Sequence, residues 1–140
     1  MRPLSAVDIF ADASALIAII AGEADAAALS DLLEAERLRL CSAVSVWETV
    51  AGLCRSYMFS VPAARTHVRR FLDAGNVQFV AIGEREFEIA GDAYAQYGKG
   101  RHPAALNMGD CFAYACARVN RAKLLFKGED FAKTDVTPAR

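Results

Sequence analysis

Apolar residues along the chain follow two different periods, one typical of strands and one typical of helices. Four short runs of β-branched or alternating apolar residues predict strands at residues 7–11, 37–41, 77–82 and 123–126. Apolar residues three and four positions apart predict helices at residues 14–21, 24–36, 43–57, 61–75, 84–97 and 108–119. This alternation predicts an α/β fold, with a parallel sheet of four to five strands and helices on both faces. Residues 132–136 are the candidate fifth strand, at a sheet edge, and a frayed tail follows them.

Two of these helices carry apolar stripes that we expect to be buried. The third helix is capped by Ser42, and its stripe contains Val46, Trp47, Val50, Leu53, Cys54 and Tyr57. The last helix is capped by Asn107, and its stripe contains Phe112, Ala115, Cys116 and Val119.

Length and composition fit one globular domain over residues 1–140. The chain is 54% hydrophobic, and a domain of this size buries roughly two thirds of its unfolded surface. Its longest apolar run, residues 13–21, is far shorter than the ~20 residues that a membrane span needs. The N-terminus shows no basic region followed by a cleavable apolar segment. We therefore expect a cytoplasmic protein without a membrane partner.

The cysteines do not form a metal-binding pattern. There is no CxxC pair, and no cysteine lies at zinc-site spacing from a histidine. We expect reduced core residues at Cys41, Cys54, Cys111 and Cys116.

Charge is unevenly distributed, although the net charge is only −1. Residues 1–50 contain eight acids and three arginines, whereas residues 95–127 contain six basic residues and a single acid. A net charge near zero argues against binding nucleic acid by an overall positive field, but the basic part can steer a polyanion. A solvated helix face is the ordinary explanation of such a run.

Two acids follow predicted strands. Asp12 comes directly after the first strand, and Asp130 comes shortly after the fourth. Ligands of open parallel sheets bind beyond the carboxyl ends of the strands, so both acids indicate a site at that edge. Ser14 either caps the helix that begins here or hydrogen-bonds to whatever Asp12 holds.

Asp110 lies in the first turn of the last helix. Three positions after the N-cap Asn107, it can complete a capping box. Acids are common there because they offset the helix dipole, so capping is the plain interpretation. Ala113 and Ala117 share its face and are too small to cover it, which leaves the carboxylate open to a ligand.

Glu48 lies beside the apolar stripe of the third helix, on a face that it shares with Ala51, Gly52 and Arg55. A glycine inside a helix costs about 1 kcal/mol relative to alanine. Close approach by another group is a reason for Gly52, and an ordinary surface glutamate is the alternative explanation of Glu48.

Four acids in one cleft need a positive counter-charge. Two carboxylates about 5 Å apart repel each other by roughly 3 kcal/mol at an effective dielectric of 20. Oxygen ligands without cysteine or histidine favour Mg²⁺ or Mn²⁺ over zinc. Such an ion can orient water and offset charge on a phosphate. Metal-assisted cleavage of nucleic acid is therefore the chemistry predicted for Asp12, Glu48, Asp110 and Asp130.

A flexible basic loop, residues 98–103 (GKGRHP), leads to Asp110. Lys99 and Arg101 are candidates to hold a phosphate backbone, although a plain exposed turn has the same composition. His102 precedes a proline and has no second histidine near it, so we do not interpret it as a metal ligand.

Taken together, four parts of the chain resemble VapC-type toxins of the PIN-domain family. They are residues 12–16 (DASAL), Glu48 after the second strand, residues 97–114 (YGKGRHPAALNMGDCFAY), and residues 126–131 (FKGEDF) with Thr134 and Asp135. The resemblance implies a single PIN-like nuclease domain, a Mg²⁺- or Mn²⁺-dependent endoribonuclease that is the toxin of a type II toxin–antitoxin pair. It also implies a homodimer and a VapB-type antitoxin whose C-terminal segment lies across the cleft.

The resemblance assigns roles to the acids. Asp12 and Asp110 are the strongest candidates for direct metal ligands. Glu48 and Asp130 would bind through water or complete the site of a second ion. Asp135 is the alternative to Asp130 as the fourth acid.

Four further residues receive supporting roles from the same resemblance. Ser14 and Asn107 would orient the metal-binding carboxylates, and Lys99 or Arg101 would hold phosphate. The segment before the first strand is slightly longer than usual in the family, which leaves the acids intact.

Two other functions stay open. A structure-specific DNA nuclease shares the PIN-like architecture, but this chain has no room for the helical arch of such enzymes. A catalytically silent interaction module would keep the acids as helix caps and use helices 14–21 and 24–36 as a partner groove. A cleavage assay with a divalent ion separates the three functions: the toxin should cleave RNA, the DNA nuclease should cleave DNA, and the interaction module should cleave neither.

Overall fold

The computed structural model describes residues 8–139, and its sheet consists of four parallel strands. They are β1 (Asp8–Ala11), β2 (Arg39–Cys41), β3 (Val77–Phe79) and β4 (Ala122–Leu125). Their order is β3-β2-β1-β4, and each neighbouring pair is parallel. The predicted α/β fold is confirmed. Val7, which the pattern adds to the first strand, lies outside the described residues.

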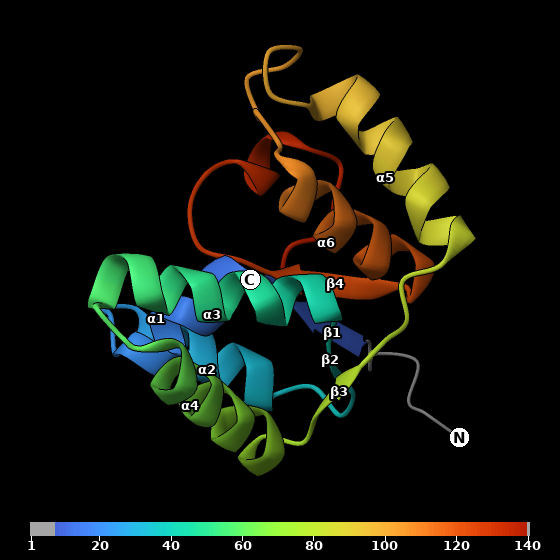
Figure 1. The fold of residues 1–140 in the computed structure, drawn as a ribbon. Helices are drawn as coiled ribbons and strands as arrows, with labels where there is room; N and C mark the ends of the chain where they lie inside the picture. The colour runs from blue at the N-terminus through green and yellow to red at the C-terminus, as the bar shows by residue number, and fades with distance from the viewer. Residues whose placement is uncertain (1–7, 140) are drawn as a thin grey trace.

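Helices cover both faces of this sheet. In the described part of the chain they are α1 (Ala13–Ala21), α2 (Ala26–Glu34), α3 (Ala43–Tyr57), α4 (Val61–Ala74), α5 (Glu84–Tyr97) and α6 (Met108–Val119). Figure 1 shows α5 and α6 on one side and α1 to α4 on the other. Alternating strand residues supply the two cores, since Phe10 faces the α5–α6 side and its neighbours Ile9 and Ala11 face the other.

The strand order brings the ends of two strands together at one edge of the sheet. The chain winds outward from β1 to β3 and then returns through α5 and α6 to place β4 on the other side of β1. The carboxyl ends of β1 and β4 therefore lie side by side at a topological switch point, where open α/β sheets bind ligands.

Helix α1 is capped by Asp12 and not by Ser14. The Asp12 side chain accepts the backbone N–H of Ser14, and the Ser14 hydroxyl donates to the same carboxylate. Ser14 is therefore not the cap, and its hydroxyl bonds to the Asp12 carboxylate itself; the hydrogen bond predicted from Ser14 to a group held by Asp12 stays a prediction. Ser42 and Asn107 are confirmed as the caps of α3 and α6.

The prediction for the buried face of α3 is wrong in part. Trp47 is 69% exposed and Tyr57 is 38% exposed, whereas the buried residues of this helix are Ser45, Thr49, Gly52 and Leu53. Close packing is the reason, because a Cβ atom at Gly52 would collide with Ile17 of α1. Small side chains let α3 approach its neighbours, as the prediction for Gly52 requires.

Among the described residues, no fifth strand forms at 132–136. Phe131–Lys133 is a single 3-10 turn, η1, and the chain then returns along β4. The Leu124 N–H donates to the Thr137 carbonyl at 2.9 Å, and the Ala139 N–H donates to the Leu124 carbonyl at 3.1 Å. The tail is therefore hydrogen-bonded to the sheet through residue 139 and not frayed.

Two properties of the described chain bear on its environment. No helix within residues 8–139 has the length and apolar character needed to cross a membrane. The four cysteines are free, and all except the half-buried Cys54 are buried.

Candidate acidic site

Asp12 stands at the carboxyl end of β1, where α1 begins. It is only 4% exposed. Its Oδ2 accepts the Ser14 backbone N–H at 3.0 Å and the Ser14 hydroxyl at 2.6 Å, which together fix the carboxylate. Burial raises the pKa of Asp12, and the hydrogen bonds from Ser14 act in the opposite direction.

Asp110 belongs to the capping box predicted for α6. Its N–H donates to Asn107 Oδ1 at 2.9 Å, and the Asn107 N–H donates to Asp110 Oδ2 at 3.0 Å. The open face predicted beside it is wrong, since Ala113 and Ala117 are 2% and 1% exposed. These alanines are small because α6 packs closely on its neighbours, while Asp110 itself is half-buried.

Glu48 reaches the site from α3. Its carboxylate lies against Gly109 of α6 so closely that a Cβ atom at position 109 would overlap both oxygens. Gly109 therefore lets α3 and α6 bring Glu48 next to the residue that precedes Asp110.

The charges of neighbouring acids raise the pKa values of Glu48 and Asp110. Burial raises the pKa of Glu48 to about 7, and the charges of Asp12 and Asp110 add to the effect. Burial also raises the pKa of Asp110 to about 6; the Asn107 backbone hydrogen bond opposes this, and the charges of Asp12 and Asp130 reinforce it. Repulsion of this kind needs short separations. The fold therefore places Asp12 and Asp110 within electrostatic range of Glu48, and Asp130 within range of Asp110, although these acids are far apart in the sequence.

Asp130 and Asp135 have different surroundings. Asp130 is exposed at the start of η1, and its charge acts on Asp110. Asp135 accepts hydrogen bonds from the Tyr114 hydroxyl at 2.6 Å and the Arg118 guanidinium at 2.9 Å. These donors lower the pKa of Asp135. Asp135 is thus held by α6, and Asp130 is the acid that the fold brings near Asp110.

The donor set fits a hard divalent ion in its chemistry. All four acids offer carboxylate oxygens, and their crowded negative charge is what a cation neutralises. Within residues 8–139, no three side chains of aspartate, glutamate, histidine or cysteine are gathered closely enough to hold an ion. Asp12 and Asp110 are instead arranged as helix caps through Oδ2.

The basic loop before α6 is more ordered than its composition predicts. It is closed at its base by a parallel bridge between Gly98 and Leu106. The Arg101 guanidinium lies over the ring of Tyr94 in α5, 5.1 Å from the ring centroid. Arg101 is therefore packed against α5, and Lys99 is exposed. Phosphate binding by these two residues stays a prediction.

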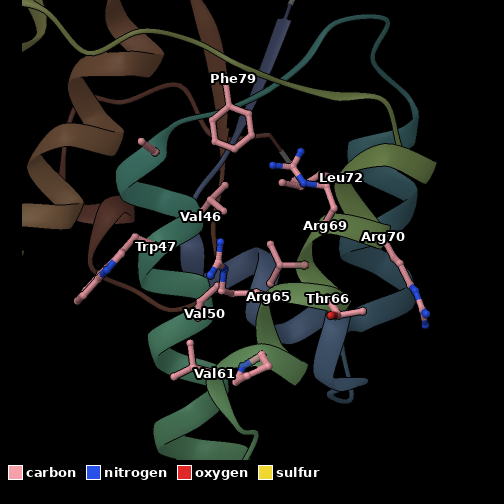
Figure 2. Close-up of a pocket in the computed structure, with 13 residues that line it drawn as sticks. Val46, Trp47, Val50, Val61, Arg65, Thr66, Arg69, Arg70, Leu72 and Phe79 are labelled. Atoms are coloured by element: carbon pink, nitrogen blue, oxygen red, sulfur yellow. The ribbon is translucent and has the colours of Figure 1, made fainter.

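The sequence pattern missed an apolar groove between α3 and α4, with a volume of about 1080 Å³. Figure 2 shows Arg65 projecting over the groove toward α3, while Trp47 and Arg70 point outward on either side. Arg69 pairs with Asp73 at 3.6 Å. The apolar lining includes Val46, Val50, Val61, Leu72 and Phe79. The sequence held one signal for this groove: Trp47 lies in the apolar stripe of α3, and the next helix, α4, is rich in arginine.

The partner groove predicted at the first two helices is smaller than the groove between α3 and α4. Helices α1 and α2 pack on each other, and a hollow of about 480 Å³ lies along α2 between Asp25 and Ala35. The α3–α4 groove is more than twice this volume.

A parallel sheet with acids at its switch point is the arrangement of a PIN domain, and the model of that family matches residues 9–136. The chain belongs to the PIN domain family, and within it to the VapC group. Ribonuclease VapC30 of Mycobacterium tuberculosis is 42% identical over 125 residues, which cover 89% of this chain and 93% of that protein. Ribonuclease VapC of Mycolicibacterium smegmatis is also 42% identical over 125 residues, with 89% and 95% covered.

Solved structures share the fold at lower identity. Mycobacterium tuberculosis VapC20, described as a sarcin-ricin loop cleaving toxin, has a TM-score of 0.72 at 19% identity and covers 92% of this chain and 96% of its own. A toxin–antitoxin complex from Klebsiella pneumoniae has a TM-score of 0.64 at 19% identity, with 91% and 92% covered.

Proposed function

We propose that the protein is the toxin of a type II toxin–antitoxin pair, an endoribonuclease that hydrolyses RNA phosphodiester bonds. The observation that carries the proposal is the acidic site at the carboxyl end of the sheet, where the charges of neighbouring acids raise the pKa values of Glu48 and Asp110. The names of the relatives support the same activity, since proteins 42% identical over nine tenths of the chain are called ribonuclease VapC.

We propose Mg²⁺ as the cofactor, with Mn²⁺ as a substitute, held by Asp12 and Asp110 and completed by Glu48 and Asp130. When bound, such an ion supplies charge neutralisation at the phosphate and a lowered pKa for water. Without an ion the pKa of Glu48 is about 7, and a bound cation would lower it, so that Glu48 is a charged carboxylate in the loaded site.

Supporting roles follow from the contacts of the site. Ser14 would keep one oxygen of Asp12 fixed while the other faces the ion, and Asn107 would do the same for Asp110. Lys99 and Arg101 would bind the RNA backbone from the loop before α6.

The test is cleavage of total bacterial RNA by purified protein with Mg²⁺, with Mn²⁺ and with EDTA. We expect divalent-dependent cleavage that Asp12→Ala and Asp110→Asn reduce to background. Asp31→Asn, an exposed acid on α2, is the matched control and should cleave normally. Cleavage of a DNA substrate instead of RNA would support the DNA nuclease, and no cleavage by a folded preparation would support the interaction module.

We also propose that the α3–α4 groove receives a segment of the VapB-type antitoxin. The apolar floor suits one face of an amphipathic helix, and tryptophan and arginine are the residue types that dominate protein interfaces. Among the described residues, Arg65 and Arg70 form no ion pair with an acid, which suits a partner with acidic side chains. A homodimer is expected in the same preparation, and light scattering measures it.

A further inference from the structure

Lys127 lies just beyond the end of β4 and contacts two segments, the start of α1 and the turn between α1 and α2. Its backbone N–H donates to the Ser14 hydroxyl oxygen at 3.0 Å. Its ammonium group pairs with Glu23 and, at 3.2 Å, with Asp25 in the turn between α1 and α2. The Tyr57 hydroxyl at the end of α3 donates to Glu23 as well. Lys127 therefore links the end of β4 to α1 directly and to the end of α3 through Glu23.

The backbone contact of Lys127 leads directly to the acidic site. A serine hydroxyl has one hydrogen to donate, and Ser14 gives it to Asp12 Oδ2 at 2.6 Å. The Lys127 N–H occupies the acceptor side of the same hydroxyl. This pairing leaves the Ser14 hydroxyl a single orientation, the one that holds Asp12, because hydrogen bonds in such chains reinforce one another.

The side chain of Lys127 anchors a segment without regular secondary structure through its ion pairs with Glu23 and Asp25. Residues 126–130 form neither helix nor strand, and Gly128 has a φ of 104°, a conformation that favours glycine. The same short segment ends at Asp130, which acts on Asp110. Glu23 accepts hydrogen bonds from both Lys127 and Tyr57. Both bonds lower its pKa, and the bond from Lys127 has the larger effect.

We infer that Lys127 is a positioning residue of the acidic site: its ion pairs with Glu23 and Asp25 hold the 126–130 segment so that its amide orients Ser14 on Asp12. The inference rests on the proposed function. Exposed ion pairs contribute little to global stability, and the Lys127 side chain is 41% exposed. A merely structural role would therefore leave the turnover number almost unchanged.

The test is steady-state RNA cleavage by Lys127→Met, which removes the charge and keeps the length of the side chain. We expect kcat to fall at least tenfold with KM within about twofold, because Asp12 is misplaced and not because RNA binds less well. Lys127→Arg should recover most of kcat. Lys133→Met, the same change at an exposed lysine of η1, is the control and should match the wild type.

Glu23→Gln provides the second variant, from the other end of the ion pair. It should lower kcat similarly, and the double variant with Lys127→Met should lose no more than either single one. Additive losses, a rise in KM alone, or an unchanged kcat in Lys127→Met would overturn the inference.

Amide hydrogen exchange by NMR gives a readout that does not require activity. The amide at position 127 should exchange at least tenfold faster in Lys127→Met and in Glu23→Gln than in the wild type. If the wild-type protein does not cleave RNA, the proposed function fails, and this measurement still decides whether the ion pairs hold the segment. Unchanged exchange would then exclude the positioning role by itself.

Discussion

At the scale of the residue, helix capping and burial have opposite effects on the charge of the same carboxylates. Asp12 caps α1 and Asp110 belongs to the capping box of α6, arrangements that favour their charged forms. Burial nevertheless raises both pKa values, and the charges of Asp12 and Asp130 raise that of Asp110 further. Glu48 has no such cap, and its pKa rises to about 7. Repulsion between these carboxylates therefore destabilises the metal-free site near neutral pH.

The free energy of unfolding of the metal-free protein should fall as the pH rises from 5 to 8. Folded Glu48 keeps a proton that the unfolded chain releases near its ordinary pKa of 4.5, so the associated stability is present at low pH and is lost through pH 7. The loss should be on the order of 1–2 kcal/mol after solvent screening. Urea unfolding in EDTA measures it, and Glu48→Gln should flatten the profile. A profile equally steep in Glu48→Gln would assign the effect to other groups.

At the scale of the element, glycines set how closely the helices approach. Gly52 admits Ile17 of α1 on one side of α3, and Gly109 of α6 admits the Glu48 carboxylate on another. Both are the small residues that such contacts require. The second contact matters more for function, because it lies within the acidic site.

Gly109→Ala should lower RNA cleavage at least tenfold with little change in stability. The new Cβ atom would displace the flexible end of Glu48, while alanine favours the helix slightly. Gly91→Ala in α5, where a Cβ atom meets open space, is the control: stability should rise by about 0.5–1 kcal/mol with unchanged cleavage. Thermal unfolding and RNA cleavage measure both variants, and normal cleavage by Gly109→Ala would show that the position of Glu48 is not critical.

At the scale of the whole molecule, one helix serves two surfaces. Helix α3 presents Glu48 to the acidic site, and it presents Val46, Trp47 and Val50 to the groove against α4. A partner seated in the groove would thus lie next to the site without needing to contact the acids.

Trp47→Ala and Arg65→Glu should each weaken binding of the proposed VapB-type antitoxin by about tenfold or more, as for an interface hot spot. RNA cleavage by the free toxin should stay within twofold of the wild type, because neither side chain belongs to the acidic site. Phe87→Ala, an exposed aromatic residue of α5, is the control. Calorimetry measures the affinities, and weakened binding by Phe87→Ala alone would place the antitoxin elsewhere.

Much of the fold and of the candidate site was predictable from local pattern. Strand and helix periods placed the elements, and Asn107 with Asp110 marked the start of α6 as the structure has it. The errors arose where a helix has more than one packed face. On α6, Ala113 and Ala117 were expected to be open and are buried, because periodicity does not say how many neighbours a helix has.

The sequence by itself determined the α/β class, the acids that follow strands β1 and β4, and the capping box of α6, since each depends on residues near one another in the chain. Only the tertiary structure decided that Trp47 lines a groove, that Asp130 and not Asp135 approaches Asp110, and that Lys127 reaches Ser14 and Glu23. These features depend on contacts between segments far apart in sequence, and such contacts exist only once the sheet has assembled and its helices have packed.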